Sequence, residues 1–130
     1  MVCLDSDIII NFLRKEKNAL NLFEKFKSED EAFITTSINS FELLKGIPKS
    51  SNMDKTRVLE FINNFEILNF DFESSKKAAE IFEDLKSKGD MIDFADIMIA
   101  SIAITNDEDL ITANLSHFKR IKELKLQEIK

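Results

Sequence analysis

Residues 94–104 read Phe-Ala-Asp-Ile-Met-Ile-Ala-Ser-Ile-Ala-Ile. Apolar side chains would cover nearly every face of a helix built from this segment, which predicts a buried helix over residues 93–105. Asp96 is the one charged residue within the segment. Burying an ionised carboxylate without a partner costs several kcal/mol. We therefore expect a helix N-terminus, a cationic side chain or a metal ion to offset that cost.

On both sides of this helix, short runs of β-forming residues alternate with amphipathic segments. The short runs predict strands at residues 2–5, 32–36, 66–70 and 109–112, and a last edge strand at 126–129. The amphipathic segments predict helices at residues 8–13, 17–28, 38–44, 53–64 and 72–87, and a short turn at 115–118. This alternation implies a mostly parallel sheet covered on both faces, a three-layer α/β/α sandwich. We expect residues 1–130 to form a single domain.

Polar and helix-breaking residues predict where two of the helices begin and end. Ser6 or Asp7 is expected to cap the helix over 8–13, and Ser37 the helix over 38–44. Gly46 and Pro48 then end that second helix.

The composition limits the class of protein. The chain has 130 residues, 44% of them hydrophobic, and its single cysteine excludes an intrachain disulfide. The N-terminus lacks a signal-peptide pattern and no apolar run has the length of a membrane span, so we expect a cytoplasmic protein. The net charge of −6 argues against a broad basic surface that coats nucleic acid. It does not argue against a nuclease, because metal-binding carboxylates are themselves negative.

Polar residues far apart in the sequence are predicted to meet at one edge of the sheet. Asp5 follows the first strand, and Thr112 to Asn114 follow a later one. Glu42 lies about one turn into the helix after the second strand, and Asp96 lies near the start of its helix. In a parallel α/β sheet the binding crevice lies beyond the carboxyl ends of the strands, where helix N-termini also lie. We expect all these side chains to face that crevice.

Three carboxylates in one crevice would repel one another unless a cation lies among them. Mg²⁺ and Mn²⁺ prefer carboxylate oxygens and water as ligands, and such an ion suits hydrolysis of a phosphodiester. We therefore favour Asp5, Glu42 and Asp96 as metal ligands and catalytic residues. The chain has only two glycines and one histidine, which indicates neither a Gly-rich phosphate loop nor a Ser-His-Asp triad.

Each candidate also has a purely structural interpretation. Asp5 can cap the helix that follows it, and Asp96 can interact with its helix dipole, although that is worth only about 0.3–1 kcal/mol. Asp93 precedes Asp96 by three residues, the spacing of an N-cap and its third helical position, so we favour a cap over a metal ligand for Asp93. Asn114 either holds a metal-bound water or shapes a turn. We expect His117 to be structural.

Four short motifs follow one another along the chain. They are Leu4-Asp5-Ser6, Phe41-Glu42-Leu43-Leu44-Lys45-Gly46, Asp96-Ile97-Met98-Ile99-Ala100-Ser101, and Leu110-Ile111-Thr112-Ala113-Asn114 with His117-Phe118. Together they resemble a PIN domain, most closely the VapC toxins of prokaryotic toxin–antitoxin pairs. Each motif alone is weak, and the ordered set, which covers essentially the whole chain, is fairly specific.

The resemblance implies a mostly parallel α/β/α sandwich and a Mg²⁺- or Mn²⁺-dependent endoribonuclease. Such a protein is usually a homodimer and is inhibited by a cognate VapB-type antitoxin. Carried over by position, Asp5, Glu42 and Asp96 become the metal-binding acids, Ser6 orients the first of them, and Thr112 lines the site.

The resemblance leaves the number of metal ions open. The family often has a fourth acid in the segment after the last motif's threonine. In this chain that segment has Asn114 and His117, and no acid before Glu123. We expect Arg14, Lys45 and Arg57 to contact RNA phosphates, and the helices over 17–28 and 53–64 to provide apolar surface for a dimer or antitoxin.

Two rival interpretations remain. Asp5-Ser6-Asp7 after a strand also resembles the nucleophile motif of haloacid-dehalogenase-like phosphatases, and Gly89-Asp90 their metal motif. In that interpretation Asp5 attacks phosphorus and Asp7 is the acid. The second rival is a PIN-fold binding module whose catalytic site is degenerate.

Overall fold

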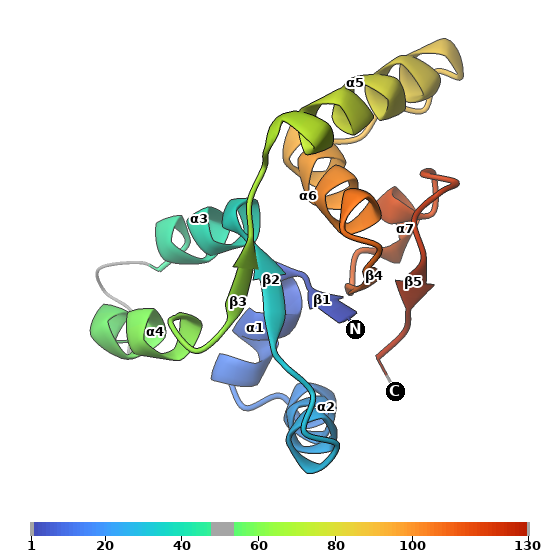
Figure 1. Ribbon diagram of the computed structural model, residues 1–130. Coiled ribbons are helices and arrows are strands. Elements are labelled where there is room, and N and C mark those ends of the chain that lie inside the picture. The colour runs from blue at the N-terminus through green and yellow to red at the C-terminus, as the bar shows by residue number, and fades with distance from the viewer. Residues whose placement is uncertain (1, 48–53, 130) are drawn as a thin grey trace.

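The sheet at the centre of the protein is parallel throughout the residues that the structure describes. The structure is a computed structural model, and it describes residues 2–47 and 54–129. Its strands are β1 (Val2–Leu4), β2 (Ile34–Thr36), β3 (Glu66–Leu68), β4 (Asp109–Ile111) and β5 (Leu126–Gln127), in the order β3-β2-β1-β4-β5 (Figure 1). Each neighbouring pair is parallel, which confirms the predicted sheet and the edge position of its last strand.

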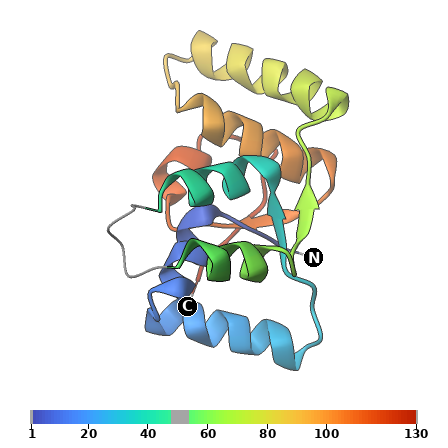
Figure 2. The same cartoon turned by 90° about the vertical axis from the view of Figure 1, so that its left-hand side faces the viewer.

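Helices cover both faces of the sheet, as a three-layer α/β/α sandwich requires. In chain order they are α1 (Ser6–Leu13), α2 (Lys17–Ser28), α3 (Ser37–Lys45), α4 (Lys55–Ile62), α5 (Phe72–Ser87), α6 (Phe94–Thr105) and α7 (Leu115–Phe118). Helices α1, α2 and α4 contribute to the core on one face, and α5, α6 and α7 to the core on the other (Figure 1 and Figure 2). Helix α3 contacts α1, α4 and α6.

Side-chain alternation along β1 divides the core in two. Cys3 faces the core beneath α5 and α6, whereas Val2 and Leu4 face the core beneath α1 and α2. This second core is rich in phenylalanine, and the rings of Phe12 and Phe23 stack with their centroids 4.0 Å apart. The strand is therefore buried on both faces, as its continuous apolar sequence indicates.

Helix α6 is buried along most of its length, as its sequence predicts. Its buried residues are Ile97, Ile99, Ala100, Ser101, Ile102 and Ala103. Its two ends are exposed: Phe94 at the first position is 66% exposed, and Thr105 at the last position is also exposed. In the apolar surroundings, the hydroxyl of Ser101 donates to the carbonyl oxygen of Met98 at 2.7 Å. Across the two described ranges, no helix is long and apolar enough to cross a lipid bilayer.

The structure corrects two of the predicted helix starts. Asp5, rather than Ser6 or Asp7, is the N-cap of α1, and its carboxylate accepts from the backbone N–H of Ser6 at 2.9 Å. Thr36, rather than Ser37, is the N-cap of α3. In both places a residue at or just after the end of a strand has the extended backbone conformation that an N-cap needs. Helix α1 therefore begins two residues, and α3 one residue, before its predicted start. Gly46 ends α3 as predicted, and Pro48 lies outside the described residues.

Candidate active site

Asp5 is buried at the carboxyl end of β1 and is held by three other segments. It is 6% exposed. Its Oδ1 accepts from the backbone N–H of Ser6 at 2.9 Å and from the side-chain amide of Asn39 at 2.6 Å. Its Oδ2 accepts from the hydroxyl of Thr112 at 2.6 Å. Strand ends and helix starts thus fix the position of one carboxylate.

This position is the topological switch point of the sheet. The chain runs outward from β1 to β2 and β3, and then returns to place β4 on the other side of β1. Ligands of open α/β sheets bind in the crevice beyond the strand ends at such a point. The backbone N–H of Asp5 donates to the carbonyl oxygen of Ile111 at 3.0 Å, so β1 and β4 are still in contact where the crevice begins.

Ser6 connects the first acid to the second. Its backbone N–H donates to Asp5, and its hydroxyl donates to Oε1 of Glu42 at 3.0 Å. Glu42 lies on α3 and is partly buried. Because Asn39 lies one turn earlier on the same helix, α3 contributes both a carboxylate and an amide to the crevice.

Asp96 reaches the same region from the first turn of α6, and its partner is a histidine. The Asp96 side chain is 13% exposed, and its Oδ2 lies 3.0 Å from Nδ1 of His117. Asn114 Nδ2 lies 3.0 Å from the same Nδ1. One ring nitrogen cannot donate to Asp96 and accept from Asn114 together. A proton on Nδ1 therefore requires the amide of Asn114 to face the ring with its oxygen. His117, expected to be structural, thus contacts a candidate ligand directly.

Asp7 joins the group, although sequence reasoning considered it only as a helix cap and in the phosphatase interpretation. Its Oδ2 accepts from the backbone N–H of Ala113 at 3.0 Å and from the hydroxyl of Thr112 at 3.3 Å. Its Oδ1 is buried and has no hydrogen-bond partner in the part of the chain that the structure describes. The sequence signal was present, since Asp7 follows Asp5 by two residues after a buried strand.

The carboxylates act on one another through their charges. Burial, and then the charges of Asp7 and Glu42, raise the pKa of Asp5 to about 7, although hydrogen bonds from Thr112 and Ser6 lower it. Burial also raises the pKa of Asp7 and of Glu42, and the charge of Asp96 adds to both shifts. Asp5, Asp7, Glu42 and Asp96 are therefore near enough for their charges to act on one another, and the metal-binding role of Asp5, Glu42 and Asp96 stays a prediction. We refer to these four residues as the acid cluster.

The acid cluster has the chemistry of a site for a hard divalent cation. Its donors are oxygens, their charges repel one another, and Asp7 Oδ1 is buried with no hydrogen-bond partner among the residues that the structure describes. Among residues 2–47 and 54–129, no group of three or more His, Cys, Asp or Glu side chains is placed to hold a metal ion as it stands. A complete cage is not required, because Mg²⁺ usually keeps several waters and takes one or two protein carboxylates. The oxygen donors therefore suit such an ion by their chemistry, although the spacing of the side chains does not by itself form a complete metal site.

Asp93 and the three basic residues lie outside the acid cluster. Asp93 is the N-cap of α6 by backbone position, but its exposed side chain makes no cap hydrogen bond, which corrects the prediction. Water can satisfy the first N–H groups of a helix that begins at the surface. Lys45 is close enough for its charge to lower the pKa of Glu42. Arg14 ends α1 at the opposite end from Asp5, and Arg57 is exposed on α4.

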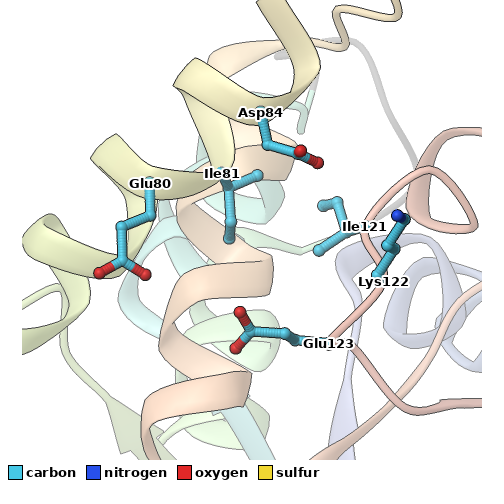
Figure 3. A pocket seen from close by; sticks show the side chains of 6 residues that line it. All are labelled: Glu80, Ile81, Asp84, Ile121, Lys122 and Glu123. Atoms are coloured by element: carbon cyan, nitrogen blue, oxygen red, sulfur yellow. The ribbon is translucent and has the colours of Figure 1, made fainter. Parts of the chain in front are cut away.

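A separate groove lies between α5 and residues 121–123 (Figure 3). Its lining residues are Glu80, Ile81, Asp84, Ile121, Lys122 and Glu123. At its edge, Lys77 Nζ lies 2.9 Å from both Glu80 Oε2 and Glu123 Oε2. Such exposed ion pairs contribute little, about 0–1 kcal/mol each. The groove contains no member of the acid cluster.

The fold and the site define an α/β/α protein with an acidic crevice at the switch point of a parallel sheet. The PIN domain family model matches residues 2–124, and the chain belongs to this family. Membership of the PIN family overturns the phosphatase interpretation. Asp90, which that interpretation needs as a metal ligand, instead lies 3.4 Å from Nε of Arg120.

Relatives cover nearly the whole chain. Ribonuclease VapC1 of Methanocaldococcus jannaschii is 29% identical over 126 residues, which cover 97% of this chain and 85% of the relative. Ribonuclease VapC3 of the same organism is 35% identical over 99 residues, which cover 76% of this chain and 94% of the relative. A crystal structure of VapBC2 from Rickettsia felis, bound to a DNA fragment from their promoter, contains a chain that matches with a TM-score of 0.88 and 26% identity, with both chains fully covered.

Proposed function

We propose that this chain is a divalent-metal-dependent endoribonuclease that acts as the toxin of a type II toxin–antitoxin system in the cytoplasm. One observation supports this most strongly. The carboxylates of Asp5, Glu42 and Asp96 belong to one group of acids whose charges act on one another, in a chain of which 97% is matched by Ribonuclease VapC1 of M. jannaschii. We further propose that residues 1–130 act as a single domain.

The chain's own residues would prepare the site for catalysis. A bound Mg²⁺ or Mn²⁺ would polarise the scissile phosphate and activate water for attack on phosphorus. Asp5 would hold the ion, because Asn39 and Thr112 fix its two oxygens with hydrogen bonds of 2.6 Å. Glu42 and Asp96 would complete the site from α3 and α6. Charge repulsion within the acid cluster is the electrostatic reason for this site to attract a cation.

Lys45 is the basic residue best placed to hold RNA near the acid cluster. It is exposed on α3, three residues after Glu42, and its Nζ lies 5.7 Å from the centroid of the Phe41 ring. Phe41 is itself exposed, and an aromatic ring beside a cation can stack an unpaired base while the cation contacts a phosphate. Arg14 and Arg57 are exposed and would contact only a longer RNA strand.

We propose a VapB-type antitoxin as the inhibitory partner and a homodimer as the toxin's own state. An apolar groove beside α2 supports the first proposal, and its lining includes Phe12, Leu20, Phe23, Phe33 and Phe61. Exposed aromatic side chains at Phe72 and Phe94 offer apolar surface to a second copy. Long apolar side chains that remain exposed are typical of interaction sites when they occur in patches.

Regulated expression in a bacterial host tests the function. We expect wild-type chain to arrest growth, co-expression of the neighbouring reading frame to relieve the arrest, and Asp96→Asn to abolish it. Asp107→Asn is the matched control, because Asp107 is exposed just beyond the other end of α6. Purified protein should cleave RNA in the presence of Mn²⁺, and EDTA should abolish the cleavage. Well-expressed, folded wild-type chain that neither arrests growth nor cleaves RNA would contradict the proposal.

A further inference from the structure

We propose that His117 is a positioning residue, which holds Asp96 in place by donating a hydrogen bond from Nδ1 to Oδ2 of its carboxylate. This inference rests on the proposed function, since it takes Asp96 to act in the divalent-cation site. It goes beyond that function, because the sequence predicted only a structural role for His117. The segment after Thr112, which has no acid before Glu123, would then contribute hydrogen-bond donors to the site.

The carboxylate of Asp96 has fewer hydrogen-bond partners than that of Asp5. Three donors hold the Asp5 carboxylate. Across the described residues, the carboxylate of Asp96 has one hydrogen bond, in which its Oδ2 lies 3.0 Å from Nδ1 of His117. The Asp96 side chain is only 13% exposed, so water has little access to replace this donor. The orientation of Asp96 therefore depends on His117.

The backbone around His117 is fixed beside the start of α6. The next residue, Phe118, is fully buried in the core beneath α5 and α6. Nη1 of Arg120 donates to the backbone carbonyl oxygen of Met91 at 3.1 Å, shortly before α6 begins. An apolar anchor and a hydrogen bond thus hold α7 against α6, which it contacts. The imidazole can therefore fix a carboxylate on α6 instead of following it.

Asn114 connects His117 to the other side of the site. It is the N-cap residue of α7 by position, but its side chain makes no cap hydrogen bond and lies 3.0 Å from His117 Nδ1 instead. When the amide oxygen faces the ring, Asn114 and Asp96 both accept from the Nδ1 proton. The backbone N–H of Asn114 donates to the hydroxyl of Thr112, which donates to Asp5. This one segment therefore contacts both Asp5 and Asp96.

Nuclear magnetic resonance tests the direction of the hydrogen bond, because His117 is the only histidine in the chain. Long-range proton–nitrogen correlation spectra of tag-free protein show which ring nitrogen carries a proton. At a pH where the ring carries one proton, we expect that proton on Nδ1. A proton on Nε2 alone would overturn the inference, since Nδ1 could not then donate to Asp96. The measurement needs neither metal nor RNA.

Two variants separate the donor from the ring. His117→Asn loses the ring but keeps an N–H donor at the same place along the side chain, whereas His117→Phe keeps a ring and loses the donor. In calorimetric titrations of metal-free protein, we expect His117→Phe to bind Mn²⁺ roughly 10–100-fold more weakly than wild type, and His117→Asn to bind within about threefold. The kcat of RNA cleavage should follow the same order, with KM little changed. Ser116→Ala, at an exposed position of α7, should match wild type.

The outcomes separate this inference from the proposed function. A ring that only fills space predicts the opposite order, so an Asn variant that binds Mn²⁺ as weakly as the Phe variant, or more weakly, would overturn the inference alone. Wild-type affinity in both variants would do the same. If wild-type protein binds no Mn²⁺ at millimolar concentration, the metal-dependent function and this role of His117 are both wrong. Circular dichroism checks the fold of each variant, and the resonance measurement on wild type decides the matter if a variant does not fold.

Discussion

The side-chain amide of Asn39 donates a hydrogen bond of 2.6 Å to Oδ1 of Asp5, and both residues are buried. The same Asn39 accepts through its Oδ1 from the hydroxyl of Thr36 at 2.8 Å. One amide thus connects the N-cap of α3 to the carboxylate after β1. The orientation of Asp5 depends on a residue that carries no charge.

Replacing Asn39 with alanine should damage both stability and activity. The change removes these hydrogen bonds and leaves a buried carboxylate with one donor fewer, so we expect the free energy of unfolding to fall by about 2 kcal/mol. A misplaced Asp5 should lower RNA cleavage by roughly 100-fold. Urea denaturation and cleavage assays measure the two effects. Asn21→Ala, at an exposed position of α2, should change neither.

The sequence predicted the sheet and helices better than the contacts of the site. Helices α2 and α5 have their predicted bounds, because each is long and strongly amphipathic. All five predicted strands are present, but each is only two or three residues long and therefore shorter than its predicted range. The edge at which Asp5 and Thr112 meet follows from parallel topology alone.

The contacts of Asn39 and Asp7 could not be predicted from strand topology in this way. Their decisive hydrogen bonds join residues 34 and 106 positions apart, and no local pattern encodes such a pair. Asn39 reads as an ordinary polar residue near a helix start. Asp93 shows the opposite error, since its spacing indicated a cap while its side chain remains in water.

The stability of the metal-free protein should fall as the pH rises through the acidic and neutral range. Burial raises the pKa of Asp5 from 3.8 to about 7, so between these values the folded state binds a proton that the unfolded state has lost. This proton uptake favours the folded state at low pH, and the advantage disappears above about pH 7. Asp5→Asn should make the free energy of unfolding depend less on pH. At pH 8 it should raise that free energy by about 4 kcal/mol at most. Equal pH slopes for both proteins in EDTA would contradict the pKa shift.

A divalent cation should stabilise the wild-type fold. At 100 times its dissociation constant, a ligand that binds only the folded state adds about 2.7 kcal/mol. For a domain of this size that corresponds to a rise of about 10 °C in the midpoint of thermal unfolding. Differential scanning calorimetry with Mn²⁺ measures it, EDTA should reverse it, and Asp5→Asn should lose most of it. A similar rise with NaCl at equal ionic strength would point to screening instead of binding.

Substitution of Gly89 should destabilise the protein because of the backbone conformation at this position. It follows α5 with φ +63°, and a Cβ built there meets nothing within 4 Å. Gly89→Ala should therefore lower the free energy of unfolding by about 1 kcal/mol through left-handed backbone strain, without any clash. Asn tolerates this conformation better than Ala, so Gly89→Asn should cost less. Urea denaturation of both variants checks the order, and an Asn variant less stable than the Ala variant would contradict it.

Thr112 should matter through its hydroxyl and not through its shape. The hydroxyl donates to Asp5 Oδ2 at 2.6 Å and accepts from the backbone N–H of Asn114 at 3.0 Å. Thr112→Val keeps the volume but leaves a buried carboxylate oxygen and a backbone N–H without this partner. We expect a loss of about 1–3 kcal/mol in the free energy of unfolding.

The same substitution has a second, more specific consequence. The Thr112 hydrogen bond lowers the pKa of Asp5, so its removal should raise that pKa further and shift the pH dependence of RNA cleavage upward. Thr56→Val is the control, because Thr56 is exposed on α4 far along the chain from the acid cluster. A pH profile of Thr112→Val that matches wild type, in a folded protein with reduced stability, would show that Thr112 supports the fold without tuning Asp5.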